Sequence, residues 1–234
     1  YASQLNDIVN RGTDADAKKE AETLLALLTP IAKAFMTETG LESANLGMQC
    51  FGGHGFIKEN GMEQLVRDAR IATIYEGTTG IQALDLLGRK VLMTQGETLR
   101  AFTKQIHQFC KAEAENDAMQ EFVKPLAELN KEWGDVTMQV GMKAMQNRDE
   151  VGAASVDYLM YSGYVALAYM FAKAAKVAQQ ALAGETTEAD FYNAKLFTAR
   201  FYFARLLPRS KSHVATMNSG ADNLQGLGAE HFSF

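Results

Sequence analysis

Apolar residues recur three or four positions apart along most of the chain, which is the spacing of one face of an α-helix. A short run of this kind ends at Gly12 and predicts a first helix. A much longer run follows the polar stretch Thr13–Asp16, which is suited to capping a helix, and continues to Gly52 and Gly53. Pro30 lies inside the long run and predicts a kink or a restart, because proline removes a backbone donor.

Short elements are predicted between these glycines and residue 95. They are a loop over Phe56–Gly61, a helical turn over Met62–Arg67, an apolar connector over Ile71–Tyr75, and a helix that begins at Thr78 or Thr79 and fades between Gly88 and Thr94. The spacing predicts that this last helix buries Ile81, Leu84 and either Leu86 or Leu87. Gly96 then marks a predicted boundary between a domain over residues 1–95 and one over 96–234.

The second domain reads as four helices and a tail. The helices carry Leu99, Phe102, Ile106 and Phe109; a seam of Met119, Phe122, Leu126, Leu129, Trp133, Val136 and Val140; an apolar stretch from Glu150 to Ala183; and, after a cap over Thr187–Asp190, the residues Phe191, Ala194, Phe197, Phe201 and Ala204. Alternating steps of three and four in the seam are typical of helices that pack at a small crossing angle. Ser210–Phe234 is predicted to be a tail on the surface. The fold class is therefore all-α, a helical bundle followed by a second helical block.

Composition excludes several classes of function. The net charge is −5, and no run of Lys and Arg is interleaved with aromatics, so nucleic-acid binding is not expected. Two cysteines and four scattered histidines form no metal-ligand pattern. The cysteines form no disulfide framework either, which favours a reducing, cytoplasmic location. The apolar stretch from Leu159 to Ala183 is interrupted by Lys173 and Lys176, so no membrane span is expected there.

Most of the candidate chemistry lies between Gln49 and Gln82. This segment contains QCFGGHG at Gln49–Gly55, RDAR at Arg67–Arg70 and YEGT at Tyr75–Thr78. The run resembles the C-terminal helical domain of acyl-CoA dehydrogenases, in which QxxGGxG and RDARxxxIYEGT occur in this order and at this spacing. The sequences of these motifs are similar to those of a long bacterial branch of the family. The resemblance implies that the chain is a piece of a longer protein.

The resemblance also implies roles for the residues of YEGT. Glu76 would be the base that removes the α-proton of an acyl-CoA thioester while the β-hydride passes to N5 of FAD. Such a base must lie within hydrogen-bond reach of the proton. Tyr75 and Gly77 would contact the substrate, the aromatic ring by excluding water and the glycine by allowing close approach. On spacing alone, Glu76 can equally be an acid that the dipole of the following helix stabilises.

FAD contacts are implied for two further groups of residues. They are Gln49, Cys50, Phe51, Gly52 and Gly53 in the first group, and Thr78, Thr79 and Gly80 in the second. The first group would contact the adenosine and pyrophosphate, often of a FAD held mainly by a neighbouring subunit, because glycines let backbone N–H groups approach an anion. An ordinary helix C-cap is the other interpretation, and both can hold. Gly80 departs from the pattern, since many members carry Gln or Glu there. Arg67, Asp68 and Arg70 are expected to form an ion-pair cluster that sets the loop carrying Glu76.

The implied partners are an acyl-CoA substrate, an electron-transfer flavoprotein and a second copy of the chain. A homodimer is expected because the additional helices of long-form relatives occupy the space of a second dimer. The chain alone is expected to be inactive, since other domains supply most flavin and thioester contacts in the family. Two alternatives stay open: an acyl-CoA oxidase that passes electrons to O₂, and a non-catalytic helical assembly module.

Overall fold

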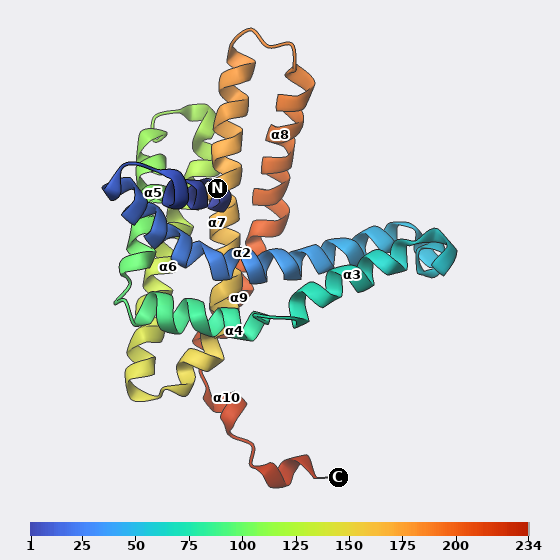
Figure 1. Cartoon of the computed structure of the whole chain (residues 1–234), viewed down its shortest axis with the longest axis vertical. Helices are drawn as coiled ribbons and strands as arrows, with labels where there is room; N and C mark the ends of the chain where they lie inside the picture. The colour runs from blue at the N-terminus through green and yellow to red at the C-terminus, as the bar shows by residue number, and fades with distance from the viewer. Residues whose placement is uncertain (234) are drawn as a thin grey trace. The chain divides into compact units, whose positions relative to one another are not determined.

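A computed structural model describes residues 1–233, and every regular element in them is a helix (Figure 1). The expected all-α class is therefore confirmed. The chain divides into two compact units, the first from Tyr1 to Thr98 and the second from Leu99 onward. Each unit has its own contacts and is described by itself.

The first unit is built around one long helix. Its elements are α1 (Ala2–Arg11), α2 (Ala15–Cys50), the 3₁₀ turns Gly52–Phe56 and Lys58–Asn60, α3 (Met62–Ile74), α4 (Thr79–Leu84) and a π-helical continuation over Asp85–Leu92. Helix α2 contacts α1, α3 and α4, and α3 runs back along the C-terminal half of α2 (Figure 1).

Helix α2 begins where the capping pattern predicts. The Asp14 side chain accepts hydrogen bonds from the backbone N–H groups of Asp16 and Ala17. The helix runs without interruption through Pro30, so a restart there is excluded. Among the described residues, α2 is the one helix whose length and composition would suffice to cross a membrane. Length and composition alone are weak evidence for a membrane span, since α2 packs against three other helices. The absence of a membrane span stays a prediction.

Helix α3 corrects the prediction of a short turn followed by a connector. It is one continuous helix of 13 residues, Met62–Ile74. Neither glycine nor proline occurs within it, and the two arginines and the alanine of RDAR favour a helix. The apolar residues near its end, which suggested a connector, are consistent with a helical stripe.

The predicted face of the next helix is partly wrong. Ile81 and Leu84 are 60% and 46% exposed, whereas Leu86 and Leu87 are both buried, together with Ala83 and Val91. The helix continues past Gly88 as a π-helix and ends at Leu92, within the predicted range from Gly88 to Thr94, and the backbone N–H of Met93 bonds to the carbonyl of Gly88. An i→i+5 winding changes which side chains share a face, so spacing rules for an α-helix fail here.

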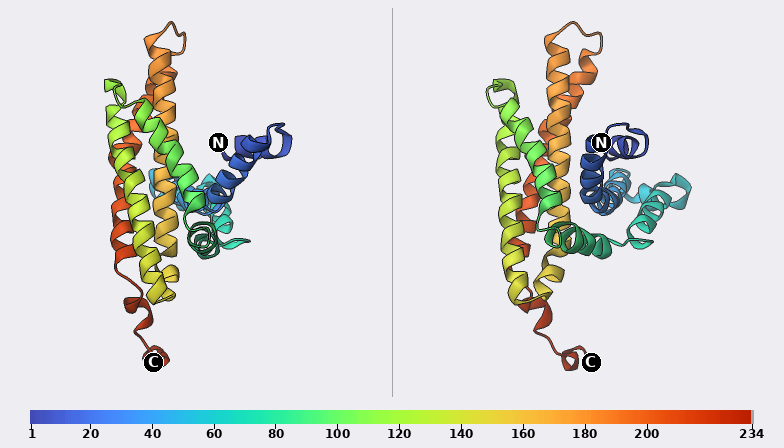
Figure 2. Two further views of the ribbon diagram at one scale, coloured as in Figure 1. Left: turned by 90° about the vertical axis from the view of Figure 1, so that its left-hand side faces the viewer. Right: turned by 60° about the vertical axis from the view of Figure 1, so that its left-hand side comes forward.

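The second unit is a bundle of long helices that run alongside one another (Figure 2). Its elements are α5 (Glu97–Ala112, which starts in the first unit), α6 (Gln120–Gln146) after a 3₁₀ turn over Asp117–Met119, α7 (Asp149–Ala183), α8 (Ala189–Phe201) with a π-helical turn over Tyr202–Leu206 and a 3₁₀ turn over Leu207–Arg209, α9 (Ser210–Asn218), α10 (Asp222–Gln225) and a 3₁₀ turn over Ala229–Phe232.

The predicted seam of α6 lies in the core of this bundle. Six of its seven positions are buried, among them Trp133, which is fully buried. Helix α7 lies against α6, α8 and α9, which explains why it is apolar over much of its circumference. It ends before Gly184, as the sequence predicts.

Helix α8 and the segment after it differ from the predictions. Phe191, Phe197 and Phe201, which were expected to pack inward, are 51%, 74% and 51% exposed, and α8 instead buries Leu196 and Ala199. The N-cap is Glu188, within the predicted segment Thr187–Asp190, but its side chain makes no capping hydrogen bond. Its backbone N–H donates a hydrogen bond to the hydroxyl of Thr186. The expected surface tail begins with a helix, α9, that packs on α7 and buries Ser210 and Met217.

One buried carboxylate ties the end of α5 to α7. Glu113 is 6% exposed, pairs with Lys176 and accepts a hydrogen bond of 3.0 Å from the Asn116 amide. Hydrogen bonds from Lys176 and then Asn116 hold the pKa of Glu113 below its ordinary value of 4.5. A lowered pKa means that the carboxylate contributes stability above the unfolded-state pKa, and that this contribution is lost as the pH falls through the folded-state pKa.

We therefore expect Glu113→Gln to lower the free energy of unfolding at neutral pH by about 1.5–3 kcal/mol, the range for a hydrogen bond to a charged group. The loss should shrink as the pH falls below 4.5 and disappear below the lowered folded-state pKa, where the wild-type carboxylate is also neutral. Urea unfolding across this window measures the effect, with the exposed Glu115→Gln as control. An equal loss at all pH values would contradict the assigned role of the charge.

Candidate functional site

The loop between α3 and α4 carries the candidate base. Tyr75 ends α3 in an extended conformation, and Thr78 precedes α4, so Glu76 and Gly77 form the middle of a four-residue loop (Figure 1). Gly77 has φ = 71°, a left-handed conformation that favours glycine. The side chains of Tyr75 and Glu76 are exposed. The loop thus presents a carboxylate outward, where a substrate can reach it.

The predicted contacts to FAD at Thr78, Thr79 and Gly80 fall at the start of α4. Thr78 occupies the N-cap position but makes no capping hydrogen bond with its side chain. The hydroxyl of Thr79 donates to Glu38 Oε1 of α2 at 2.5 Å. Because that hydroxyl proton is already in use, Thr79 has only acceptor capacity left for a ligand.

The other predicted cofactor segment lies at the end of α2. Gln49 and Cys50 are its last residues, Phe51 caps it, and Gly52 adopts φ = 56°. The interpretation as a helix C-cap is therefore confirmed. All five residues from Gln49 to Gly53 are exposed, so their backbone stays accessible, and FAD contact stays a prediction.

The structure does not bring the two predicted segments together. The glycine turn precedes α3 and the loop of Glu76 follows it, so the 13 residues of α3 separate them. At a rise of about 1.5 Å per residue this is about 20 Å. One compact ligand group therefore cannot contact both ends of α3 at once.

The expected ion-pair cluster is wrong. Among these described residues the structure shows no ion pair between Arg67, Asp68 and Arg70; the Gln64 amide donates to Asp68 at 2.7 Å, and Arg70 donates to the hydroxyl of Thr73 at 2.9 Å. The loop of Glu76 is instead flanked by contacts from α2. The ammonium group of Lys33 donates to the carbonyl of Ala72 at 2.9 Å and lies 5.3 Å from the centre of the Tyr75 ring.

Gly77→Ala is expected to lower the free energy of unfolding by about 1–2 kcal/mol, the cost of a left-handed conformation for a residue with a Cβ. A methyl group at Gly77 would also overlap the Gln82 amide, which must then move. Denaturant unfolding measures this. Gly80→Ala is the control: its added Cβ meets no atom within 4 Å, and alanine favours the helix. Equal stability of the two variants would contradict the assigned conformation.

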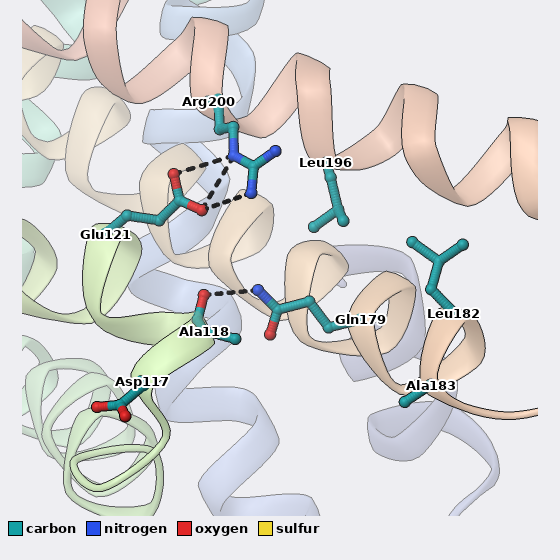
Figure 3. A pocket seen from close by; sticks show the side chains of 8 residues that line it. All are labelled: Asp117, Ala118, Glu121, Gln179, Leu182, Ala183, Leu196 and Arg200. Atoms are coloured by element: carbon teal, nitrogen blue, oxygen red, sulfur yellow. Dashed lines mark hydrogen bonds and ion pairs between the residues drawn. The ribbon is translucent and has the colours of Figure 1, made fainter.

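The second unit has a surface pocket of about 450 Å³ between the start of α6 and the ends of α7 and α8 (Figure 3). Its polar groups bond to each other: both Arg200 Nε and Nη2 donate to Glu121 at 2.8–3.0 Å, and the Gln179 amide donates to the Ala118 carbonyl at 2.6 Å. Sequence reasoning gave no hint of this pocket, because it joins residues far apart in the chain. We assign it no ligand.

Two protein-family models match the chain. The one described as "Acyl-CoA dehydrogenase, C-terminal domain" matches residues 9–92, and the one described as "Acetyl-CoA dehydrogenase C-terminal like" matches residues 102–227, more than half of the chain. The chain belongs to the acyl-CoA dehydrogenase family.

Similar proteins cover both units. A 3-methylmercaptopropionyl-CoA dehydrogenase of Ruegeria pomeroyi is 36% identical over 93% of this chain and 37% of its own length. The broad-specificity linear acyl-CoA dehydrogenase FadE5 of Mycobacterium tuberculosis is 33% identical over 86% and 34%, and a butyryl-CoA dehydrogenase of Syntrophomonas wolfei is 28% identical over 86% and 33%. The chain thus spans between 33% and 37% of the length of these three relatives.

Proposed function

We propose that the chain is the C-terminal part of a flavin-dependent acyl-CoA dehydrogenase that introduces an α,β double bond into an acyl-CoA thioester. The observation that carries the proposal is the exposed carboxylate of Glu76 on a short loop between two helices, in a chain of this family. Glu76 removes the α-proton, and FAD supplies the hydride acceptor when it is bound. Tyr75 and Gly77 flank the proton-transfer path.

The exposed positions of the candidate site fit a cofactor and substrate held together with other protein surface. Glycines at Gly52 and Gly53 leave backbone N–H groups accessible to a pyrophosphate, and the oxygen of Thr79 can accept a hydrogen bond. Because about 20 Å separates the glycine turn from Glu76, the two segments suit two different FAD molecules of a homodimer. A cytoplasmic location and an electron-transfer flavoprotein as acceptor belong to the same proposal.

Anaerobic flavin bleaching tests this function. The whole flavoprotein that contains this chain is mixed with a panel of acyl-CoA thioesters, and the absorbance of oxidised flavin is followed. We expect at least one thioester to bleach the flavin, and an electron-transfer flavoprotein to restore the colour faster than O₂. Hydrogen peroxide formation at the turnover rate would select the oxidase alternative, and a whole protein without FAD would select the assembly module. The chain alone should show no flavin bleaching and should not bind an acyl-CoA.

A further inference from the structure

The position of Glu76 depends on what holds the ends of its loop. The loop contains Gly77, the residue type with the greatest backbone freedom, and the Glu76 side chain is exposed. A general base works only when its carboxylate stays within hydrogen-bond reach of the proton that it removes. Groups that fix the two flanking helix ends therefore matter for the reaction even without touching the substrate.

Lys33 of α2 holds the end of α3. Its ammonium group donates to the Ala72 carbonyl at 2.9 Å, three residues before Tyr75. That carbonyl belongs to the last turn of α3, where carbonyls lack partners within the helix and a positive charge is favourable. The same ammonium group lies over the Tyr75 ring at 5.3 Å, a cation–π distance. One side chain thus contacts both the helix end and the first residue of the loop.

Glu38 of α2 holds the start of α4. Its carboxylate accepts a hydrogen bond of 2.5 Å from the hydroxyl of Thr79, the first residue of that helix. Glu38 is partly buried, as is Lys33. Between the two, Ala34 and Phe35 are buried, so this part of α2 is anchored.

We propose that Lys33 and Glu38 are positioning residues for the catalytic loop. They lie five residues apart on one helix, about 7.5 Å along its axis, and hold the two ends of the loop across 39 and 41 positions of sequence. Helix α2 therefore sets both the spacing of the loop ends and the place of the Glu76 carboxylate. The inference rests on the proposed function, because positioning matters only if Glu76 is the base.

The rate of flavin reduction in a single anaerobic turnover of the whole enzyme tests the proposal. Lys33→Met and Glu38→Ala are expected to lower this rate about 10–100-fold, as misplacement of a catalytic group by about 1 Å does. FAD content and acyl-CoA binding should change less than about threefold, because neither Lys33 nor Glu38 belongs to the proposed cofactor and substrate contacts. Lys19→Met and Glu22→Ala, at exposed positions of the same helix, are the matched controls and should keep the wild-type rate.

A conservative variant separates positioning from folding. Glu38→Gln keeps an acceptor for Thr79 and should retain most of the rate that Glu38→Ala loses. If Glu38→Ala fails to fold, Lys33→Met decides, since it removes the other contact from α2.

Wild-type rates in Lys33→Met and in Glu38→Ala would overturn the proposal while leaving Glu76 as the base. If no acyl-CoA reduces the wild-type flavin, the proposed function fails instead. Hydrogen exchange then decides the positioning role independently of activity. The hydrogen-bonded amides at the two loop ends, Tyr75 to the Ile71 carbonyl and Gln82 to the Thr78 carbonyl, should exchange faster in Lys33→Met and Glu38→Ala than in the two controls. Unchanged exchange at these amides would refute the role of α2.

Discussion

Glu76→Gln should abolish most flavin reduction by acyl-CoA while leaving substrate binding intact. The amide has nearly the shape of the carboxylate but cannot accept the α-proton, so the reduction rate is expected to fall about 10²–10⁴-fold, the usual contribution of a general base. The side chain is exposed and lies in a loop, so its replacement should leave the free energy of unfolding nearly unchanged. Anaerobic stopped-flow absorbance of the whole enzyme measures the rate, and titration with the same thioester measures binding.

A matched control is Glu59→Gln, which makes the same change at an exposed position in the turn between α2 and α3. It should reduce flavin at the wild-type rate. If Glu76→Gln reduced flavin as fast as the control, the base would lie elsewhere and the role of the YEGT loop would be wrong. A loss of binding without a loss of the limiting rate would make Glu76 a residue that holds the substrate.

The all-α class, the long helices and the chemistry-bearing segments could be predicted from the sequence. Local signals carried these predictions: the cap at Asp14, the left-handed Gly52 that ends α2, and the apolar seam of α6. The motif residues also placed Glu76 just before a helix, where the structure has it. In each case the information lies within a few positions of the residue concerned.

What the sequence did not show are contacts between distant positions. The contacts of Lys33 with Ala72 and of Glu38 with Thr79 join residues 39 and 41 positions apart, and nothing local marks them. The expected ion-pair cluster relied on neighbours in sequence, which on a helix point to different sides.

Apolar spacing was equally ambiguous where a helix has two apolar faces. Helix α8 carries one face with Leu196 and Ala199 and another with Phe197 and Phe201, and period alone cannot tell which is buried. The larger side chains suggested the inward face, yet they are the exposed ones. The choice depends on where α7 lies, which is a property of the folded unit.

Trp133→Ala is expected to be the most damaging single change to the stability of the second unit. Trp133 lies on α6 and its side chain is fully buried. The centres of its ring and of the Phe102 ring of α5 are 6.1 Å apart, in a T-shaped arrangement. Phe102 in turn packs against Tyr169 of α7 at 5.8 Å, so one aromatic cluster joins three helices. Truncating a buried Trp removes apolar contact and leaves a cavity that the bundle fills incompletely.

The expected loss is about 3–5 kcal/mol in the free energy of unfolding. At about 2–4 °C per kcal/mol for a chain of this size, the melting temperature should fall by about 6–20 °C. Urea unfolding of the chain followed by circular dichroism measures it, with Met145→Ala, at an 89% exposed position of the same helix, as control. Trp133→Phe should recover part of the loss because it keeps an aromatic ring against Phe102. A loss below about 1 kcal/mol in Trp133→Ala would mean that the packing of the three helices does not depend on this aromatic cluster. The other apolar side chains of α7 would then stabilise the bundle.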